Sequence, residues 1–384
     1  MKTKPKILLL IEPSRGYERA LLRGIARYAQ LHGPWIIPRE AAFWENRHHR
    51  VLMSQIRSAD GIIMRENACR DEILALGKPA AISNYATERI DGAVNIHSDH
   101  RAIGNLAASH LIERGFLHFG FCGYGRFFWS RQRYEGFRSR VEAVGRTVDC
   151  YDAARPSRAM PWEKEQAFVI DWLRSLPKPA GVMCCVDERS HQIAEACKAA
   201  GIAVPEDVAI VGVDNDEMIC TLSSIPLSSV SLTAEMGGYE AASRLHQLIN
   251  GRGSTRRAVM VHPADVVART STDVFAAQDP HISKAVRFIG GHCREILYVS
   301  DVARAAGLSR RVLEKRFRIL LDRSVNEHIR QCRIRHICKL LTDTDMTISD
   351  IAIAMGLSDA AHIARFFKSR SRMSPAEYRR THRL

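Results

Sequence analysis

The sequence has no apolar run long enough to enter a membrane. Its first apolar run, Ile7–Ile11, ends after five residues at Glu12, whereas an export signal needs roughly 7–15 apolar residues and a membrane-spanning helix roughly 20. A secreted or membrane-spanning protein is therefore disfavoured. We expect a cytoplasmic protein that makes no membrane contact.

The ten cysteines are scattered, and none lies in a Cys-x-x-Cys pair. Cys184 and Cys185 lie within the apolar run Ala180–Val186, where cysteine behaves as a small buried hydrophobe. This usage predicts no disulfide framework and fits a reducing compartment. The histidines also lack the spacing of a metal site, so we expect no bound metal; those considered are His48, His49, His97, His100 and His118.

Sequence signatures of common catalytic and cofactor sites are missing as well. Gly123 and Gly125 lack the third glycine of a dinucleotide-binding loop, and the chain has neither a Gly-x-Ser-x-Gly elbow nor a phosphate-binding loop. We therefore expect a protein that is not an enzyme and carries no cofactor.

Acidic residues are scarce in the last quarter of the chain. Residues 278–384 hold 21 Lys and Arg against 11 Asp and Glu, and so carry +10 of the formal net charge of +14. A basic segment attached to a nearly neutral body is typical of a protein that meets nucleic-acid phosphate, although a solvated basic surface would give the same count.

Residues 6–272 alternate short apolar runs with amphipathic stretches, the rhythm of parallel strands covered by helices on both faces. This content fits an α/β domain of two similar lobes, with ligands bound beyond the carboxyl ends of the strands. We place this ligand-binding α/β domain at 1–274, a polar linker at 275–280 and an all-α domain at 281–384. Strands are expected at 6–11, 61–64, 79–83, 119–122, 180–186 and 208–213, and helices at 17–31, 71–76, 99–114, 131–144, 163–176, 189–200 and 239–249.

A near-repeat in the last quarter carries the strongest signal. Residues 302–317 and 351–366 each read as a short helix, a Gly-Leu-Ser turn and a second helix, with Gly307 and Gly356 suited to a left-handed turn. A three-helix bundle of any function has glycine turns and amphipathic helices. Two such units in tandem, within a basic domain, favour a pair of helix-turn-helix units that bind DNA sequence-specifically.

In each of the two units the pattern predicts which side chains cap the helices, which pack in the core and which lie at the surface. The expected helix caps are Ser300 or Asp301, Ser309, Thr347 or Ser349, and Ser358. The side chains expected to pack inward are Val312, Leu313, Phe317, Ile363, Phe366 and Phe367. The residues left facing outward, and so toward DNA, are Arg310, Arg311, Glu314, Lys315 and Arg318 in the first unit and Asp359, Ala360, Ala361, His362 and Arg365 in the second.

An amphipathic helix at 325–341 connects the two units. Its length of roughly 25 Å, at about 1.5 Å per residue, suits two recognition helices set about one DNA turn, about 34 Å, apart.

Residues 281–384 resemble the DNA-binding domain of AraC-type transcription factors. The segment Phe366–Arg379 is similar to the signature of that family, but Arg372 stands where the family usually has glycine and Ile363 where an aromatic residue is common. The resemblance implies base contacts from the second helix of each unit, at Arg311, Glu314, Lys315, Ala360, Ala361 and Arg365. Because alanine offers only apolar contacts, we expect the first unit to make most hydrogen bonds to bases.

The body resembles the periplasmic-binding-protein-like sensor of lactose-repressor-type regulators. The similar segments are Asp99 with the helix end His110–Gly115, Arg133–Phe137, Val204–Asp207 and Val211–Asn215. A sensor followed by an AraC-type domain is the order found in bacterial xylose operon regulators, which the segments Leu227–Val230 and Leu313–Phe317 also resemble. The resemblance implies a sugar as the effector.

A sugar site needs polar partners for vicinal hydroxyls and an aromatic ring for a C–H face. The resemblance places Arg133 and Asp214 at effector hydroxyls. Asp187 is expected to face the crevice from the end of a strand, and Trp129 to offer a stacking platform. Further candidates at the mouth of the first lobe are Asp99, Arg15 and Tyr17. The alternative for each is a polar residue that lies at the surface or only bridges the lobes.

We therefore expect a sugar-responsive, DNA-binding transcription regulator of carbohydrate use, an activator rather than a repressor. Its expected partners are double-stranded DNA, a second copy of the chain and RNA polymerase. The alternatives are a regulator that senses a nucleobase or another small metabolite, and a sugar-binding or sugar-processing protein with the same sensor fold.

Overall fold

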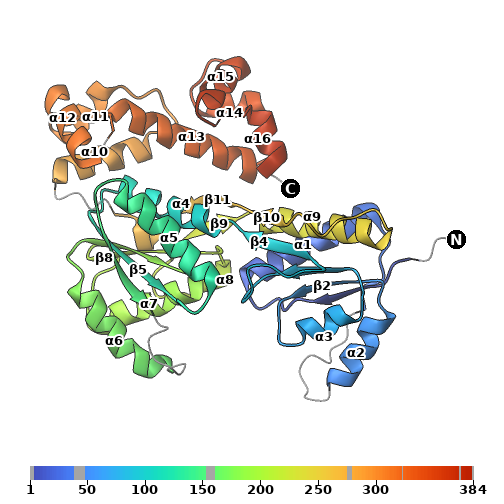
Figure 1. The fold of residues 1–384 in the computed structure, drawn as a ribbon. Helices are drawn as coiled ribbons and strands as arrows, with labels where there is room; N and C mark the ends of the chain where they lie inside the picture. The colour runs from blue at the N-terminus through green and yellow to red at the C-terminus, as the bar shows by residue number, and fades with distance from the viewer. Residues whose placement is uncertain are drawn as a thin grey trace. The chain divides into compact units, whose positions relative to one another are not determined.

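The computed structural model describes residues 4–38, 48–152, 161–274, 279–321, 323–371 and 373–382. The chain divides into two compact parts. One consists of Met1–Ser109 and His118–Asp273, and the other of His110–Leu117 and Val274–Leu384. The former is α/β, and the later part of the chain is helical (Figure 1). None of the helices in these described ranges is long and apolar enough to cross a membrane.

The first sheet has five strands, all parallel, in the spatial order β1, β2, β3, β4, β10. Its two faces bury separate apolar clusters, one beneath α1 and α9 and the other beneath α2 and α3. The strands are β1 (Ile7–Leu10), β2 (Gly61–Arg65), β3 (Ala80–Ser83), β4 (Val94–Ser98) and β10 (Val259–Val261), and the helices are α1 (Gly16–His32), α2 (His48–Ser58), α3 (Arg70–Ala75) and α9 (Ala234–Ile249).

The second sheet has six strands in the order β11, β9, β8, β7, β5, β6, and only β11 runs antiparallel to its neighbour. A cluster under α6 and α7 covers one face. The strands are β5 (His118–Gly123), β6 (Val148–Asp152), β7 (Ala180–Cys184), β8 (Val208–Val213), β9 (Ser228–Leu232) and β11 (Pro263–Val267), and the helices are α4 (His100–Glu113), α5 (Phe128–Glu142), α6 (Trp162–Ser175), α7 (Asp187–Ala200) and α8 (Glu217–Leu222).

The chain passes between these two lobes three times, near Asp99, Thr233 and His262. At each point the element before it belongs to one lobe and the element after it belongs to the other. Hydrogen bonds join the crossings: Thr233 N donates to His262 O at 2.9 Å, and Asp99 N donates to Val261 O at 2.9 Å. Such a set of parallel crossings is a hinge about which two lobes can close on a ligand.

The helical part of the chain holds two small apolar cores. Val302, Leu313 and Phe317 are in the first core, and Ile351 and Phe367 are in the second. Its helices are α10 (Pro280–Gly291), α11 (Val299–Ala306), α12 (Arg310–Leu321), α13 (Val325–Asp343), α14 (Ile348–Ala354), α15 (Ala360–Ser371) and α16 (Pro375–His382).

The expected two-lobed α/β sensor and helical domain are present, and all six predicted strands are strands. Five others were missed, β4, β6, β9, β10 and β11, because they are short or carry polar residues. Several boundaries were wrong: α5 begins at Phe128 and α9 at Ala234. Of the predicted linker, 275–278 lies outside the described residues, while Asp279 caps α10 and Pro280 begins it.

Candidate effector and DNA-binding sites

Arg133 and Asp214, the first two predicted effector residues, lie together in the second lobe. Asp214 follows β8 and Arg133 lies on α5, and 3.6 Å separates Arg133 Nη2 from Asp214 Oδ1. Arg133 also donates to the carbonyl of Cys185. Burial raises the pKa of Asp214 and the nearby guanidinium of Arg133 opposes that rise. Within the described ranges the buried Nε of Arg133 has no hydrogen-bond partner.

Trp129 is on α5, one turn before Arg133, whose guanidinium lies 5.2 Å from the centre of its ring. The ring of Trp129 stacks on that of Phe127, with 5.5 Å between centroids and 14° between planes. Its indole Nε1 is buried and finds no acceptor among the residues that the structure describes. A buried donor without an acceptor costs free energy, so this atom is suited to an added ligand.

Glu18, which was not predicted from the sequence, offers a buried acceptor in the first lobe. It lies in the first turn of α1, is 5% exposed, and has its Oε1 3.4 Å from Arg65 Nη1. Its Oε2 is buried with no partner in the described part of the chain. Burial raises the pKa of Glu18, opposed by Arg65, and the charge of Asp214 raises it further. A carboxylate directly after Tyr17, past the end of a buried strand, was the signal available.

Arg15 and Tyr17, both predicted, lie beside Glu18 at the start of α1. Arg15 pairs with Glu188 of the second lobe, with 3.0 Å between Nε and Oε1. The hydroxyl of Tyr17 lies 3.5 Å from Ser98 Oγ, and burial raises the pKa of Tyr17 to about 12. Tyr17 is therefore a neutral donor, and Arg15 connects the two lobes.

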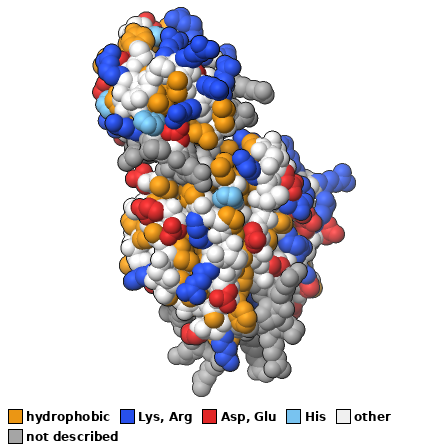
Figure 2. Space-filling model, turned by 90° about the vertical axis from the view of Figure 1, so that its left-hand side faces the viewer, with side chains coloured by type: hydrophobic (Ala, Val, Ile, Leu, Met, Phe, Trp, Pro, Cys, Tyr) orange, Lys and Arg blue, Asp and Glu red, His pale blue; other side chains and the backbone are white. Residues whose placement is uncertain are grey.

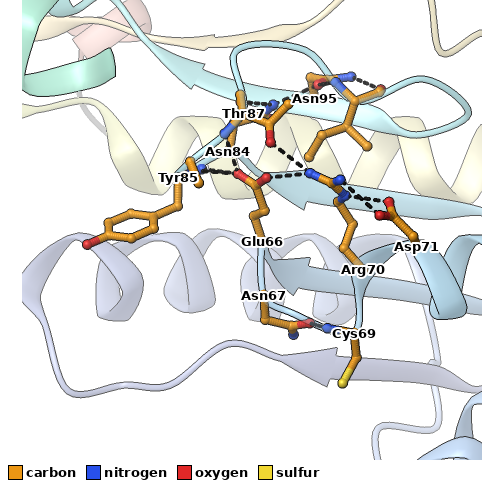
Figure 3. Close-up of polar contacts among 11 residues, drawn as sticks. Glu66, Asn67, Cys69, Arg70, Asp71, Asn84, Tyr85, Thr87 and Asn95 are labelled. Carbon is orange, nitrogen blue, oxygen red and sulfur yellow. Dashed lines mark hydrogen bonds and ion pairs between the residues drawn. The ribbon is translucent and has the colours of Figure 1, made fainter. Parts of the chain in front are cut away.

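Tyr85 is presented by a loop after β3 that Glu66 holds in place (Figure 3). Glu66 Oε2 accepts from the backbone N–H groups of Tyr85, Ala86 and Thr87 at 2.8, 2.7 and 2.9 Å, and its Oε1 pairs with Arg70 at 2.6 Å. Although burial opposes it, these hydrogen bonds lower the pKa of Glu66. The Tyr85 side chain points away from this network (Figure 3).

The ring of Tyr85 reaches residues of both lobes. The guanidinium of Arg65 lies 4.1 Å from its centre, and the ring of Phe127 in the second lobe lies 4.8 Å away. Trp129 is 6.2 Å from it, so three aromatic rings gather where the lobes meet. Tyr85 and Phe127 were not selected from the sequence because no periodic pattern marks a loop residue.

Asp187 does not face the crevice as predicted. It is the first residue of α7, is fully buried, and both of its oxygens are occupied: Oδ1 accepts from Ser229 Oγ at 2.6 Å and Oδ2 from Asp216 N at 2.8 Å. Burial raises its pKa, as does the charge of Asp214. These contacts hold the loop that follows β8, in which Asp214 lies.

Asp99 lies at the first crossing between the lobes. Its Oδ1 accepts from Ala102 N at 3.0 Å and so caps α4, and its Oδ2 lies 3.7 Å from His262 Nδ1. These contacts belong to the hinge and not to the group around Arg133 and Asp214.

The two helix-turn-helix units repeat one another closely in structure. Gly307 and Gly356 both have positive φ, +67° and +63°. Beyond the turn, Leu313 and Phe317 in α12 and Ile363 and Phe367 in α15 are fully buried. The buried residues of the second helices are thus fifty positions apart, one more than the spacing of the glycines.

One extra residue, Asp359, accounts for that offset. Its Oδ1 accepts from His362 N at 2.7 Å, so Asp359 and not Ser358 caps α15. In the first unit Ser309 Oγ accepts from Val312 N at 3.4 Å, as predicted. Position 310 therefore corresponds to position 360, and Lys368, missed in the sequence analysis, corresponds to Arg318.

The first helices differ from the prediction in one cap. Thr347 caps α14, as one of the two predictions had it. α11 begins at Val299, so neither Ser300 nor Asp301 is its cap; Asp301 Oδ2 instead accepts from the N–H of Tyr298 at 3.2 Å.

Basic side chains cover the outer surface of the second helices. Arg310, Arg311, Lys315 and Arg318 are exposed on α12 with Glu314 half-buried, and Ala361, His362, Arg365 and Lys368 are exposed on α15 with Ala360 half-buried. Lys and Arg side chains also gather on the helical part in the view of Figure 2. Val312, expected to pack inward, is 37% exposed. Helix α12 thus presents four exposed cations, and α15 presents three, because Arg370 near its end is also exposed.

Both the sensor and the helical part of the chain match known protein families. Residues 108–272 match the periplasmic binding protein-like domain, and residues 302–381 match a helix-turn-helix domain. The xylose operon regulatory protein of Haemophilus influenzae is 30% identical over 383 residues, covering 97% of this chain and 98% of that protein. The protein of the same name from Escherichia coli K12 is 28% identical over 389 residues, covering 97% and 96%.

Solved structures agree with this placement. The structure of the xylose-binding transcription activator xylR matches with 26% identity and a TM-score of 0.62, covering all of both chains. A LacI family regulator from Enterococcus faecium with bound ribose, 18% identical with a TM-score of 0.55, covers 69% of this chain and 97% of its own, and shares the fold of the sensor. With 30% identity over nearly the full length of both chains, this chain belongs to the xylose operon regulatory proteins, transcription regulators in which a two-lobed sensor precedes an AraC-type DNA-binding domain.

Proposed function

We propose that this regulator responds to a small sugar bound where its two lobes meet, and that a pentose such as xylose is the first candidate. Three buried polar atoms carry the proposal: Glu18 Oε2, Arg133 Nε and Trp129 Nε1, which have no partner among the described residues. Buried polar groups in folded proteins are nearly always hydrogen-bonded, so a ligand that supplies the partners is favoured at this place.

The chemistry of these groups suits hydroxyls. Glu18 accepts from a hydroxyl hydrogen, and Arg133 and Trp129 donate to hydroxyl oxygens, while the aromatic face of Trp129 suits the C–H face of a ring. Asp214, held by Arg133, adds a second carboxylate from the other lobe. Because acceptors come from both lobes, a bound sugar would connect them and favour the closed arrangement.

A nucleobase is the second candidate, favoured by one observation. The rings of Tyr85, Phe127 and Trp129 lie within 4.8–6.2 Å of one another, a grouping that could stack on a flat heterocycle. Glu18 would then accept from a ring N–H instead of a hydroxyl.

The deciding experiment is a thermal-unfolding screen of the full chain with D-xylose, D-ribose, D-glucose, adenine and guanine. A pentose should raise the unfolding temperature in a concentration-dependent way, as any ligand of the folded state does. Asp214→Ala should abolish this stabilisation and leave DNA binding intact, whereas Glu142→Gln, an exposed change on α5, should not alter it. Stabilisation by a purine alone would contradict a sugar effector.

We also propose how the output end works. Arg310, Arg311, Lys315 and Arg318 would read and hold the DNA from α12, and Arg365 with Lys368 would position α15, with no catalytic step at either site. The protein would act in the cytoplasm as a homodimer bound to two DNA half-sites. It would activate transcription through RNA polymerase, as the description of the similar solved structure, a xylose-binding transcription activator, suggests. A footprint of purified protein that shows no repeated half-sites would contradict the dimer.

A further inference from the structure

Helix α13 has one regular stripe of buried residues, and the middle residue of that stripe is a charged arginine. Val325, Ile329, Arg333, Ile337 and Leu341 follow one another at intervals of four, and all are buried. Val325 and Ile329 pack in the first core, while Ile337 and Leu341 pack in the second. Arg333, which is 7% exposed, therefore lies where the two helix-turn-helix units meet.

The guanidinium of Arg333 binds backbone carbonyls of both units. It donates to Cys293 O at 3.3 Å and to Glu295 O, in the loop that leads into α11. From its other amino group it donates to Met355 O, at the C-terminal end of α14. One planar group thus joins the entrance of the first unit to the turn of the second, which no smaller donor could span.

A second contact shows that these two segments meet. A Cβ built on Gly356, in the turn of the second unit, would lie 3.4 Å from the carbonyl oxygen of Arg294 and 3.8 Å from Ile296 N. The turn that leads into α15 therefore packs against the loop that leads into α11, on the side where Arg333 binds.

Burial of a cation is expensive, and an apolar residue at position 333 would fill the stripe at lower cost. Burial lowers the pKa of Arg333, and its hydrogen-bond partners named above are carbonyls and not carboxylates. Buried polar residues of this kind can fix the register of packed elements at the expense of stability.

We propose that Arg333 is a positioning residue that sets the orientation of α12 relative to α15, and so the distance between the two DNA segments that one chain reads. An apolar side chain would keep both cores but let the units shift about α13. This inference rests on DNA binding by both units, as proposed above.

The test uses the full chain and a DNA site selected with the wild type from random sequence. Versions of the site carry one to five base pairs inserted between the segments that the two units protect. The wild type should bind the uninserted site best, because one base pair moves a segment both along and around the DNA axis. Arg333→Met should lose about tenfold in affinity for the uninserted site, the scale of hydrogen bonds to a charged group, and should bind the inserted sites nearly as well as that site.

Two further variants separate position from charge and from folding. Arg330→Met removes an exposed arginine from the same helix and should keep the wild-type spacing preference. Arg333→Lys keeps the charge without the fork and should relax the preference partly; it serves as the test if Arg333→Met unfolds the helical part by circular dichroism. A spacing preference unchanged in these position-333 variants overturns the role of Arg333, whereas a wild type without any preference overturns DNA reading by both units.

Discussion

Arg19 in the first lobe donates to Asp216 in the second, with 2.6 Å between Nη2 and Oδ1. The other oxygen of Asp216 accepts from Gly16 N at 2.7 Å, at the start of α1, where a Cβ would lie 3.0 Å from the Asp216 backbone. Asp216 is 3% exposed. A single carboxylate therefore holds the beginning of α1 against the second lobe, and a side chain at position 16 would push Asp216 away by a few tenths of an ångström.

Asp216→Asn should weaken the closed arrangement of the lobes. Asparagine still caps α8 but loses the charge that strengthens the bond to Arg19, which is worth roughly 1.5–3 kcal/mol for a charged hydrogen bond. Effector affinity by calorimetry should fall, and small-angle scattering should show a larger radius of gyration without effector. Glu235→Gln removes an ion pair to Arg23 within the first lobe and should change neither. Equal behaviour of the two variants would show that Asp216 does not control closure.

Glu18→Gln should stabilise the protein while removing effector response. Burial raises the pKa of Glu18, so the folded state binds more protons than the unfolded state above the ordinary glutamate pKa, and this residue lowers stability as pH rises through the shifted pKa. At pH 7 the variant should therefore unfold at a higher temperature than wild type. At pH 4 the difference should shrink, because glutamate is then largely protonated in both states. A lower unfolding temperature at pH 7, or unaltered effector affinity, would contradict this account.

Much of the fold was predictable because the sequence carries it in periodic form. Buried parallel strands such as β7 are continuous apolar runs, and helices such as α1 show one apolar face. Strand β9 reads Ser-Ser-Val-Ser-Leu and has no such signature, because its first two residues are serines, which are buried and donate to Arg269 O and to Asp187 Oδ1. Its identity as a strand depends on tertiary contacts that local pattern does not contain.

The candidate effector site was predictable only in part for a similar reason. Arg133 and Asp214 stood in recognisable segments, and the structure brings them together. Glu18 and Tyr85 reach the same place through the ends of two further strands, which local sequence does not relate to one another. Asp187 shows the opposite error, because a carboxylate after a strand can turn inward when a serine and a backbone N–H are there to bind it.

His328→Tyr should reduce the sensitivity of the helical part to acid. His328 is 2% exposed, and burial, aided by the charges of Arg335 and Arg323, lowers its pKa to about 3. The unfolded state then binds more protons than the folded state below about pH 6.5, so stability falls as the pH drops toward 3. Tyrosine is the residue at the equivalent position 378, where its ring meets Phe367 at 5.3 Å and 76°, as His328 meets Phe317 at 5.5 Å and 76°.

Thermal melts at pH 7 and 4.5, followed by circular dichroism, measure this effect. The loss of stability between the two pH values should be smaller in His328→Tyr than in wild type. His362→Tyr makes the same replacement at an exposed position and should lose as much as wild type. A pH dependence that is the same in all three proteins would show that His328 does not titrate with unfolding.

Arg311→Met and Lys368→Met should affect DNA binding in different ways. Arg311 is exposed at the start of α12, where a guanidinium can bind one base with two hydrogen bonds. Its loss should therefore cost about 1–3 kcal/mol of binding free energy on the preferred site and relax the preference at one base position.

Lys368 is exposed toward the end of α15, and a lysine that contacts phosphate adds affinity without sequence preference. Lys368→Met should therefore weaken binding to all sequences alike and lower the slope of log affinity against log salt by about one. Arg252→Met, an exposed change in the sensor, should leave both base preference and salt slope as they are. If Arg311→Met instead lost affinity uniformly and kept the base preference, the first unit would hold the DNA without reading it, and base recognition would have to come from α15.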